Sequence, residues 1–314
     1  MKLGIDMGGM SIKMGLVNEE NKIIGRITIP TDLTVPYQTL VERMADAVRQ
    51  MLENAGMTLE QCGGIGIGSP GTIDAKQGVI LYSNNFGWEN VPIVEELKKH
   101  LDTRIEIAND ADAAALGEVC AGAAEGAENA VLLTLGTGVG SGVILDKKIF
   151  RGAMPGGCEL GHLSIRYDGI RCTCGRKGCL EAYASASALL RIAREKAAEH
   201  PESIMNEMCK NDLEQMNGKI PFDAAKAGDE AGMETVKEYE GYLACGIANV
   251  INTFRPEKVI LGGGVAAQKD NLTAPLKDLV KDMCFGGSHG HIADIVTSVL
   301  GNDAGIIGAA NLVV

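Results

Sequence analysis

The sequence lacks the features that mark membrane proteins and nucleic-acid-binding proteins. It contains no run of about 18 apolar residues, so we expect no transmembrane helix. The opening residues, Met1 to Asp6, include an acidic residue and lead into a glycine pair, which does not resemble a signal peptide. Basic residues are scarce, 29 against 41 acidic ones, and the net charge of −12 disfavours phosphate backbones and acidic membrane surfaces. We therefore expect a cytoplasmic protein without nucleic-acid or membrane partners.

The chain also lacks a linker rich in proline, serine or glycine. Its 314 residues exceed what one compact core usually spans, so two domains are expected. Without a linker, these domains should share a tight cleft. We place the boundary near residue 120, which gives domains at 1–120 and 121–302. The small, apolar closing segment, 303–314, should pack back on one domain, the first in our assignment.

A weak internal repeat indicates two copies of one α/β plan. In each copy, short strands joined by a glycine turn and a polar turn form an antiparallel hairpin. The first copy places strands at 2–6, 12–17 and 23–29, and the second at 130–135, 142–145 and from 149. Further strands are expected at 64–68, 104–108 and 258–261, and helices at 40–55, 92–101, 111–124, 185–200 and 230–253.

Glycine is abundant, at 41 residues, and it clusters at three corners. The first is Asp6-Met7-Gly8-Gly9, which an ordinary hairpin would also explain. The second, residues 135–142, holds four glycines, more than a hairpin needs, and Thr137 adds a hydroxyl. The third, residues 262–264, follows an apolar strand and precedes an expected helix, whose free N–H groups suit a nucleotide. Three such corners in register indicate phosphate binding by backbone N–H groups.

The most specific local signal is a group of cysteines at 172, 174 and 179, with His162 ten residues before the first. Three thiols and one imidazole can converge on a single tetrahedral ion, and such closed sites hold structural zinc. The alternative is three reduced cysteines without a shared role. The other six of the nine cysteines are scattered and are expected to be reduced thiols.

The three corners resemble the phosphate-1, phosphate-2 and adenosine motifs of the actin-like ATPase superfamily, whose lobes have a ribonuclease H-like fold. Within it, the chain resembles the ROK family of repressors and sugar kinases over essentially its whole length, and the cysteine spacing resembles the family's zinc pattern. The resemblance implies a duplicated two-domain fold with an interlobe cleft, and it implies ATP, Mg²⁺ and structural Zn²⁺ as cofactors. The residues assigned to nucleotide and Mg²⁺ are Asp6, Gly8, Gly9, Met10, Ser11, Thr137, Gly138, Gly262, Gly263 and Gly264.

The resemblance also assigns a sugar site. From local sequence alone, Asn109 and Asp110 are interpreted as helix N-capping residues. In ROK kinases the matching pair binds sugar, and its Asp is the general base. Asp112, where the family commonly has Asn, is expected to be a helix cap. The substrate residues implied are Gly71, Asn85, Asn109, Asp110, Glu159, His162 and Glu181, and the ligands of zinc are His162, Cys172, Cys174 and Cys179.

The activity implied is transfer of phosphate from ATP to the 6-hydroxyl of a hexose, with Asp110 as general base. Glucose is the expected hexose, because the Gly-Ser-Pro-Gly turn before residue 72 and the Asn-x-x-Trp element look most like Gram-positive-type glucose kinases. Kinases of N-acetylmannosamine, N-acetylglucosamine, fructose or allose are the alternatives. A sugar-responsive repressor is less compatible, because no helix-turn-helix domain fits before Asp6, and a polymerising ATPase would not need a polyol site. A homodimer, or a higher homo-oligomer, is the family expectation.

One residue departs from the family pattern at the first corner. ROK kinases usually have Thr where this chain has Met10, so one hydroxyl donor towards the phosphates is lost. Ser11 or Thr137 could supply a hydroxyl in its place, and the backbone N–H groups remain. We expect weakened ATP affinity rather than loss of activity, because one hydrogen bond to a charged group is worth about 1.5–3 kcal/mol.

Overall fold

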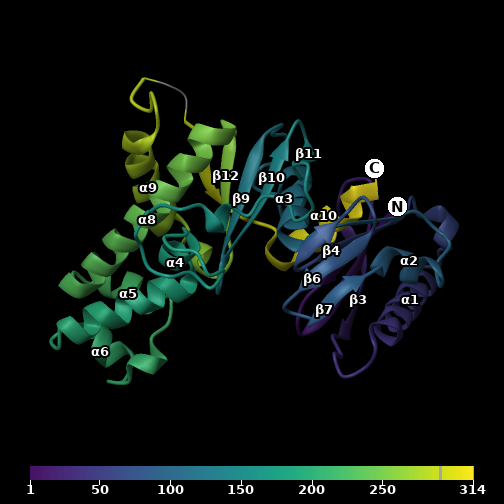
Figure 1. Cartoon of the computed structure of the whole chain (residues 1–314), viewed down its shortest axis with the longest axis horizontal. Coiled ribbons are helices and arrows are strands. Elements are labelled where there is room, and N and C mark those ends of the chain that lie inside the picture. The colour runs from purple at the N-terminus through teal and green to yellow at the C-terminus, as the bar shows by residue number, and fades with distance from the viewer. Residues whose placement is uncertain (290–291, 314) are drawn as a thin grey trace. The chain divides into compact units, whose positions relative to one another are not determined.

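The computed structural model describes residues 1–289 and 292–313, and Figure 1 shows the course of the chain. Contacts divide it into two compact units. Unit 1 is built from Met1–Leu132, Gly142–Cys158 and Val299–Val314, and unit 2 from Leu133–Ser141 and Glu159–Ser298. The chain therefore passes from one unit to the other four times. The predicted domain boundary near residue 120 remains a prediction.

A mixed sheet of five strands forms the centre of unit 1. Its strand order is β3-β2-β1-β4-β8, in which β1, β2 and β3 are antiparallel and β4 and β8 run parallel to β1. Alternate apolar side chains point to one face of a strand, and those of β1 and β2 are fully buried. The strands are β1 (Lys2–Met7), β2 (Ser11–Val17), β3 (Ile23–Pro30), β4 (Ile65–Ser69) and β8 (Ile105–Asn109).

Helices complete the core of unit 1. Helix α1 (Tyr37–Asn54) buries one apolar face in the same core as β1, β2 and β4. The shorter α2 (Ile93–Lys98) leads towards β8, after which the chain enters α3 (Asp110–Ala121). The last helix, α10 (Ala304–Ala310), packs directly on α3. A side chain on Gly308 would overlap the backbone of Ala113, so this crossing requires glycine.

A second, small sheet in unit 1 was not expected from the sequence. It consists of β5 (Thr72–Asp74), β6 (Val79–Ser83) and β7 (Trp88–Val91), paired antiparallel. Trp88 packs against Phe86 and Tyr37, with ring centroids 4.9 and 6.1 Å away. Trp88 thus has the packing role that a lone tryptophan usually has.

The second five-stranded sheet repeats the plan of the first. Its order is β11-β10-β9-β12-β13, and β12 and β13 are parallel. An antiparallel hairpin followed by parallel strands therefore occurs twice, which confirms the predicted duplication. The strands are β9 (Ala130–Leu135), β10 (Val139–Leu145), β11 (Lys148–Ile149), β12 (Lys258–Gly262) and β13 (Asp294–Thr297). β10 begins three residues earlier than predicted, so the turn before it is shorter.

Helices make up most of unit 2. The longest, α8 (Glu230–Phe254), packs on α5 (Ala186–Glu199), α7 (Ile220–Lys226) and α9 (Asp270–Met283). Two short helices, α4 (Glu181–Ala184) and α6 (Ile204–Met208), flank α5 in the chain. The third glycine corner runs into a 3₁₀ turn, Val265–Gln268, and α9 begins only at Asp270, which corrects the expected direct entry into a helix.

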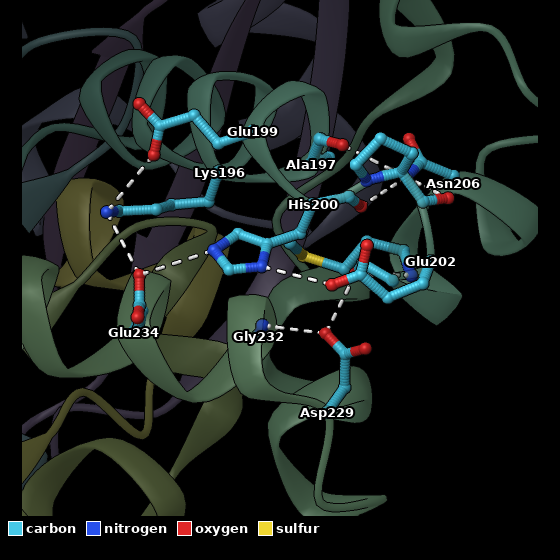
Figure 2. A network of polar contacts seen from close by, with 12 residues as sticks. Lys196, Ala197, Glu199, His200, Glu202, Asn206, Asp229, Gly232 and Glu234 are labelled. Atoms are coloured by element: carbon cyan, nitrogen blue, oxygen red, sulfur yellow. Dashed lines mark hydrogen bonds and ion pairs between the residues drawn. The ribbon is translucent and has the colours of Figure 1, made fainter.

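A polar network joins the ends of α5, α6 and α8 (Figure 2). The Asp229 carboxylate accepts from Gly232 N in the first turn of α8, at 2.8 Å. It also accepts from Ser203 Oγ at 2.8 Å and from Ile204 N at 3.0 Å, at the start of α6. One carboxylate therefore caps two helices.

Charged residues on α5 and α8 continue this network. Lys196 Nζ lies 3.4 Å from Glu199 and 3.0 Å from Glu234. Hydrogen bonding to Lys196 lowers the pKa of Glu234 below its ordinary value. His200 Nδ1 lies 3.3 Å from Glu202 (Figure 2). Because the glutamate of each pair is exposed to solvent, we expect each pair to add little stability. No helix of the described ranges is both long and apolar enough to span a membrane.

Candidate active site and metal centre

The first glycine corner joins β1 to β2 in unit 1. Gly8 N donates to Ser11 O at 3.0 Å, and Thr31 Oγ1 donates to Gly8 O at 2.6 Å, so the turn is held from two sides. The side chain of Met10 is 90% exposed and contributes nothing to the core. This corner can present backbone N–H groups to an anion without help from residue 10.

Two partly buried carboxylates in unit 1, Asp6 and Asp110, have raised pKa values. Burial raises the pKa of Asp6, Lys13 lowers it, and the charge of Asp110 raises it again. Burial also raises the pKa of Asp110, against the opposing effect of hydrogen bonds from the N–H groups of Ala111 and of Asp110 itself. A carboxylate whose pKa lies above the ordinary value is a better proton acceptor, which suits a general base.

Asn109 performs the capping role and a second one. Its Oδ1 accepts from Ala111 N at 2.9 Å, which makes it the N-cap of α3. Its Nδ2 donates to Gly71 O at 3.1 Å and so fixes the turn between β4 and β5. Asp112, expected to be a cap, lies inside the first turn of α3 with only 3% exposure. The capping prediction is therefore wrong for Asp112, because Asn109 is the last extended residue before the helix.

A cavity of about 260 Å³ opens beside Asn109 within unit 1. Its wall combines the start of α3, the β5–β6 turn and a glycine-rich loop; the side chains at its edge include Asp74, Lys76, Asp112, Arg151 and Met154. No motif in the sequence marks this loop, residues 151–157, as part of a cavity. Asn85 is exposed in the turn between β6 and β7, and its side chain makes no hydrogen bond to described residues.

The predicted zinc ligands come together in unit 2. The ligand atoms of His162, Cys172, Cys174 and Cys179 all lie within 4.8 Å of one another. Cys174 Sγ is 3.6 Å from Cys179 Sγ, and Cys172 Sγ is 3.7 Å from His162 Nδ1. Four ligands at tetrahedral angles with Zn–S bonds of about 2.3 Å would be about 3.8 Å apart, so the donor set fits zinc.

The electrostatics of this cluster also favour a cation. Burial and the two neighbouring thiols raise the pKa of Cys179 to about 12, because three thiolates cannot gather without a positive charge. A hydrogen bond from the backbone N–H of Arg176 lowers the pKa of Cys174. Since His162 presents Nδ1 to the thiols, its Nε2 is left for another partner. All four predicted ligands are thus brought together as the sequence analysis expected.

Glu181, the first residue of α4, contacts two separate parts of unit 2. Its Oε1 accepts from Thr173 Oγ1 at 2.9 Å and from Cys172 Sγ at 3.4 Å. Its Oε2 accepts from Val139 N, at the second glycine corner, at 3.0 Å. The contact with Val139 was not predicted, because 42 residues separate the two in sequence.

The second and third glycine corners lie side by side. A side chain on Gly263 would overlap the backbone of Leu135, so the two turns touch through glycine. Next to Gly264, a cavity of about 580 Å³ reaches Gly218 and Lys219 ahead of α7. The sequence analysis found no motif in α7 and therefore did not single out its residues. Because α7 lies beside the third corner, its residues are candidates for contact with a nucleoside.

The candidate residues therefore form two groups, one in each unit. Unit 1 carries Asp6, the first corner, Gly71, Asn85, Asn109 and Asp110, and unit 2 carries Thr137, Gly138, Glu159, His162, Glu181, the third corner and the zinc ligands. Glu159 precedes the 3₁₀ turn Leu160–His162, and Leu160 N donates to Ser141 Oγ at 2.9 Å. Glu159 and His162 are near each other in the sequence, and this turn also keeps them close in space.

Comparisons with known proteins agree over the whole chain. The model of the ROK family matches residues 2–314. A glucokinase of Thermotoga maritima is 36% identical over 312 residues, which are 99% of this chain and 96% of that protein. A glucokinase of Halalkalibacterium halodurans is 36% identical over 317 residues, covering 99% and 94%. A ROK family glucokinase from Streptomyces griseus, solved in complex with glucose and AMPPNP, matches with a TM-score of 0.79 at 31% identity and covers 99% of this chain and 98% of that one.

Proposed function

Because the chain belongs to the ROK family and has its actin-like fold, we propose that it is an ATP-dependent hexose kinase that converts glucose to glucose 6-phosphate. The observation that carries the mechanism is Asp110. It is a partly buried carboxylate with a raised pKa at the first position of α3, next to an asparagine that already holds the Gly71 turn. This combination provides a base and a fixed hydrogen-bonding amide on one rigid element.

Asp110 accepts the proton of the sugar 6-hydroxyl as that oxygen bonds to the γ-phosphorus of ATP. The bond between the γ-phosphorus and its bridging oxygen breaks, and ADP leaves. Most of the catalysis in such a transfer comes from positioning and charge stabilisation. Mg²⁺ bound with ATP would neutralise charge on the phosphate oxygens, and the Asp6 carboxylate is the group we assign to it, through water.

The residues that we assign to the sugar by family resemblance occur in each unit. Gly71, Asn85 and Asn109 belong to unit 1, and Glu159, His162 and Glu181 belong to unit 2. Carboxylate and amide oxygens accept hydrogen bonds from several hydroxyls, which suits a polyol. His162 would use Nδ1 for zinc and Nε2 for a sugar hydroxyl, so that the metal fixes the orientation of a substrate residue.

The nucleotide is assigned to the three glycine corners. Asp6, Gly8, Gly9, Met10 and Ser11 form the first, Thr137 and Gly138 lie in the second, and Gly262, Gly263 and Gly264 form the third. The support is the contact between the second and third corners and the cavity beside Gly264. Zinc is assigned a structural role, because its four protein ligands leave no open position for chemistry.

The finer features of this proposal rest on the family. Membership of the ROK family is the support for three further proposals: a homodimer, a cytoplasmic location and a role in glycolysis. The choice of glucose is supported by the two glucokinases that match along their whole lengths. Light scattering on the purified protein would measure its oligomeric state.

A coupled assay of ADP release over a panel of hexoses tests the proposed function. Glucose should have the highest kcat/KM, ahead of N-acetylmannosamine, N-acetylglucosamine, fructose and allose. Asp110→Asn should remove most of the activity, because the amide cannot accept a proton. Asp102→Asn is the matched control, since Asp102 is an exposed carboxylate of the same unit. Equal rates for Asp110→Asn and the parent would reject the mechanism.

A further inference from the structure

We propose that Thr173 and Glu181 connect the zinc site to the second glycine corner, so that zinc helps to position the backbone that binds nucleotide. The inference rests on the proposed function for the identity of that ligand. It adds a positioning role for Thr173, which the sequence analysis did not assign. It also gives the metal a second effect besides orienting His162.

The carboxylate of Glu181 uses its two oxygens for two different elements. Oε1 accepts from Thr173 Oγ1 at 2.9 Å, and Oε2 accepts from Val139 N at 3.0 Å. Hydrogen bonds to a charged acceptor are among the stronger ones in proteins. A rigid, planar group therefore spans the distance between the zinc loop (residues 162–179) and the start of β10.

Thr173 lies between two of the zinc ligands, Cys172 and Cys174. Binding of both neighbours to one ion would fix the backbone of Thr173 and with it the direction of the hydroxyl. The contact of Cys172 with Glu181 cannot serve this purpose, because a thiolate bound to zinc has no proton to donate. The threonine hydroxyl is therefore the link that persists when the metal is bound.

At the other end of the link, the glycine corner depends on where Glu181 lies. A side chain on Gly138 would overlap Glu181 Oε2, so the carboxylate packs directly against the corner. By taking the N–H of Val139, it sets the orientation of the peptides before it. The N–H groups of Thr137 and Gly138 donate no hydrogen bond within the described chain, which leaves them for phosphate oxygens.

Nucleotide affinity should therefore depend on the Thr173 hydroxyl and on zinc through one shared route. The test is calorimetric titration of MgADP, without sugar, into zinc-loaded and zinc-stripped protein. Thr173→Val, matched to the parent in zinc content, should bind MgADP about threefold to tenfold more weakly, the usual worth of one hydrogen bond. Thr173→Ser should restore the affinity. Stripping zinc should weaken the parent more than it weakens Thr173→Val, because the variant has already lost the link.

Thr253→Val is the matched control. It removes an exposed threonine hydroxyl of the same unit that donates only to Asn249 O on its own helix. It should leave MgADP affinity unchanged. Thermal unfolding of each variant separates loss of folding from loss of positioning. Equal MgADP affinity for the zinc-loaded parent and Thr173→Val overturns the inference, and so does an equal effect of zinc removal on both.

These outcomes are independent of the proposed reaction. A protein that binds MgADP with the expected dependence on zinc and Thr173 but phosphorylates no hexose rejects the proposed function alone. A protein that phosphorylates glucose, but whose affinity for MgADP depends on neither zinc nor Thr173, rejects the inference alone.

Discussion

Replacing Asp229 by alanine should destabilise unit 2 far more than loss of an ordinary helix cap. The carboxylate caps α8 through Gly232 N at 2.8 Å, and an N-cap is worth about 1 kcal/mol. It also accepts from Ser203 Oγ and Ile204 N at 2.8 and 3.0 Å, and each such bond contributes about 0.5–1.5 kcal/mol. We expect Asp229→Ala to lower the free energy of unfolding by about 2–4 kcal/mol.

Urea denaturation followed by circular dichroism measures this effect. Asp229→Asn should recover about half of the loss, because asparagine is a good N-cap but offers only one acceptor oxygen. Asp212→Ala is the matched control, since the Asp212 carboxylate accepts only within its own 3₁₀ turn, Leu213–Gln215, from Glu214 N and Gln215 Nε2. If Asp229→Ala costs no more than Asp212→Ala, then the shared cap is not a significant source of stability.

Four further predictions follow from the site and the core. Removing zinc with a strong chelator should abolish sugar binding and lower the unfolding temperature, and unchanged glucose affinity in metal-free protein would contradict this role. Met10→Thr should lower the KM for ATP by up to about 100-fold without changing stability, because the side chain is 90% exposed and a hydroxyl there adds one phosphate donor. As the pH falls, kcat/KM should decline through a pKa above the ordinary 3.8 of aspartate, because burial of Asp110 favours its protonated form; a decline only below 3.8 would refute this. Burial raises the pKa of Glu240 to about 7 from 4.5, so its ionisation costs stability as the pH rises from about 4.5 to 7, and the loss is complete above 7; Glu240→Gln should therefore gain stability over the parent at pH 9 and lose that gain at pH 5, as measured by thermal unfolding.

The sequence predicted those parts of the site that are encoded locally. The cysteines at 172, 174 and 179 are close in sequence, so a short loop with two glycines was sufficient to infer their convergence with His162. The first two glycine corners are likewise single turns between strands, and the third directly follows β12. The duplicated hairpins followed from the spacing of apolar runs, and both sheets confirm them.

Other parts depend on contacts between residues far apart in sequence. The small sheet at 72–91 has short strands interrupted by turn residues, and its pairing is decided by packing around Trp88. Asp112 was expected to be a cap because aspartate favours helix starts, yet the chain turns helical two residues earlier. The contact of Glu181 with Val139 and the cavity beside Gly264 have no local signature at all.

The place of α10 has a consequence for how the protein is made. This helix packs on β1 and α3, and a side chain on Gly305 in its first turn would crowd the Asp6 carboxylate. The ribosome synthesises these residues only after all of unit 2 has been made. During translation, one apolar face of the earlier strands and helices of unit 1 therefore stays uncovered until α10 has been synthesised. A nascent or prematurely terminated chain therefore lacks a finished surface around Asp6, and chaperone binding to stalled chains should be strongest just before α10 emerges.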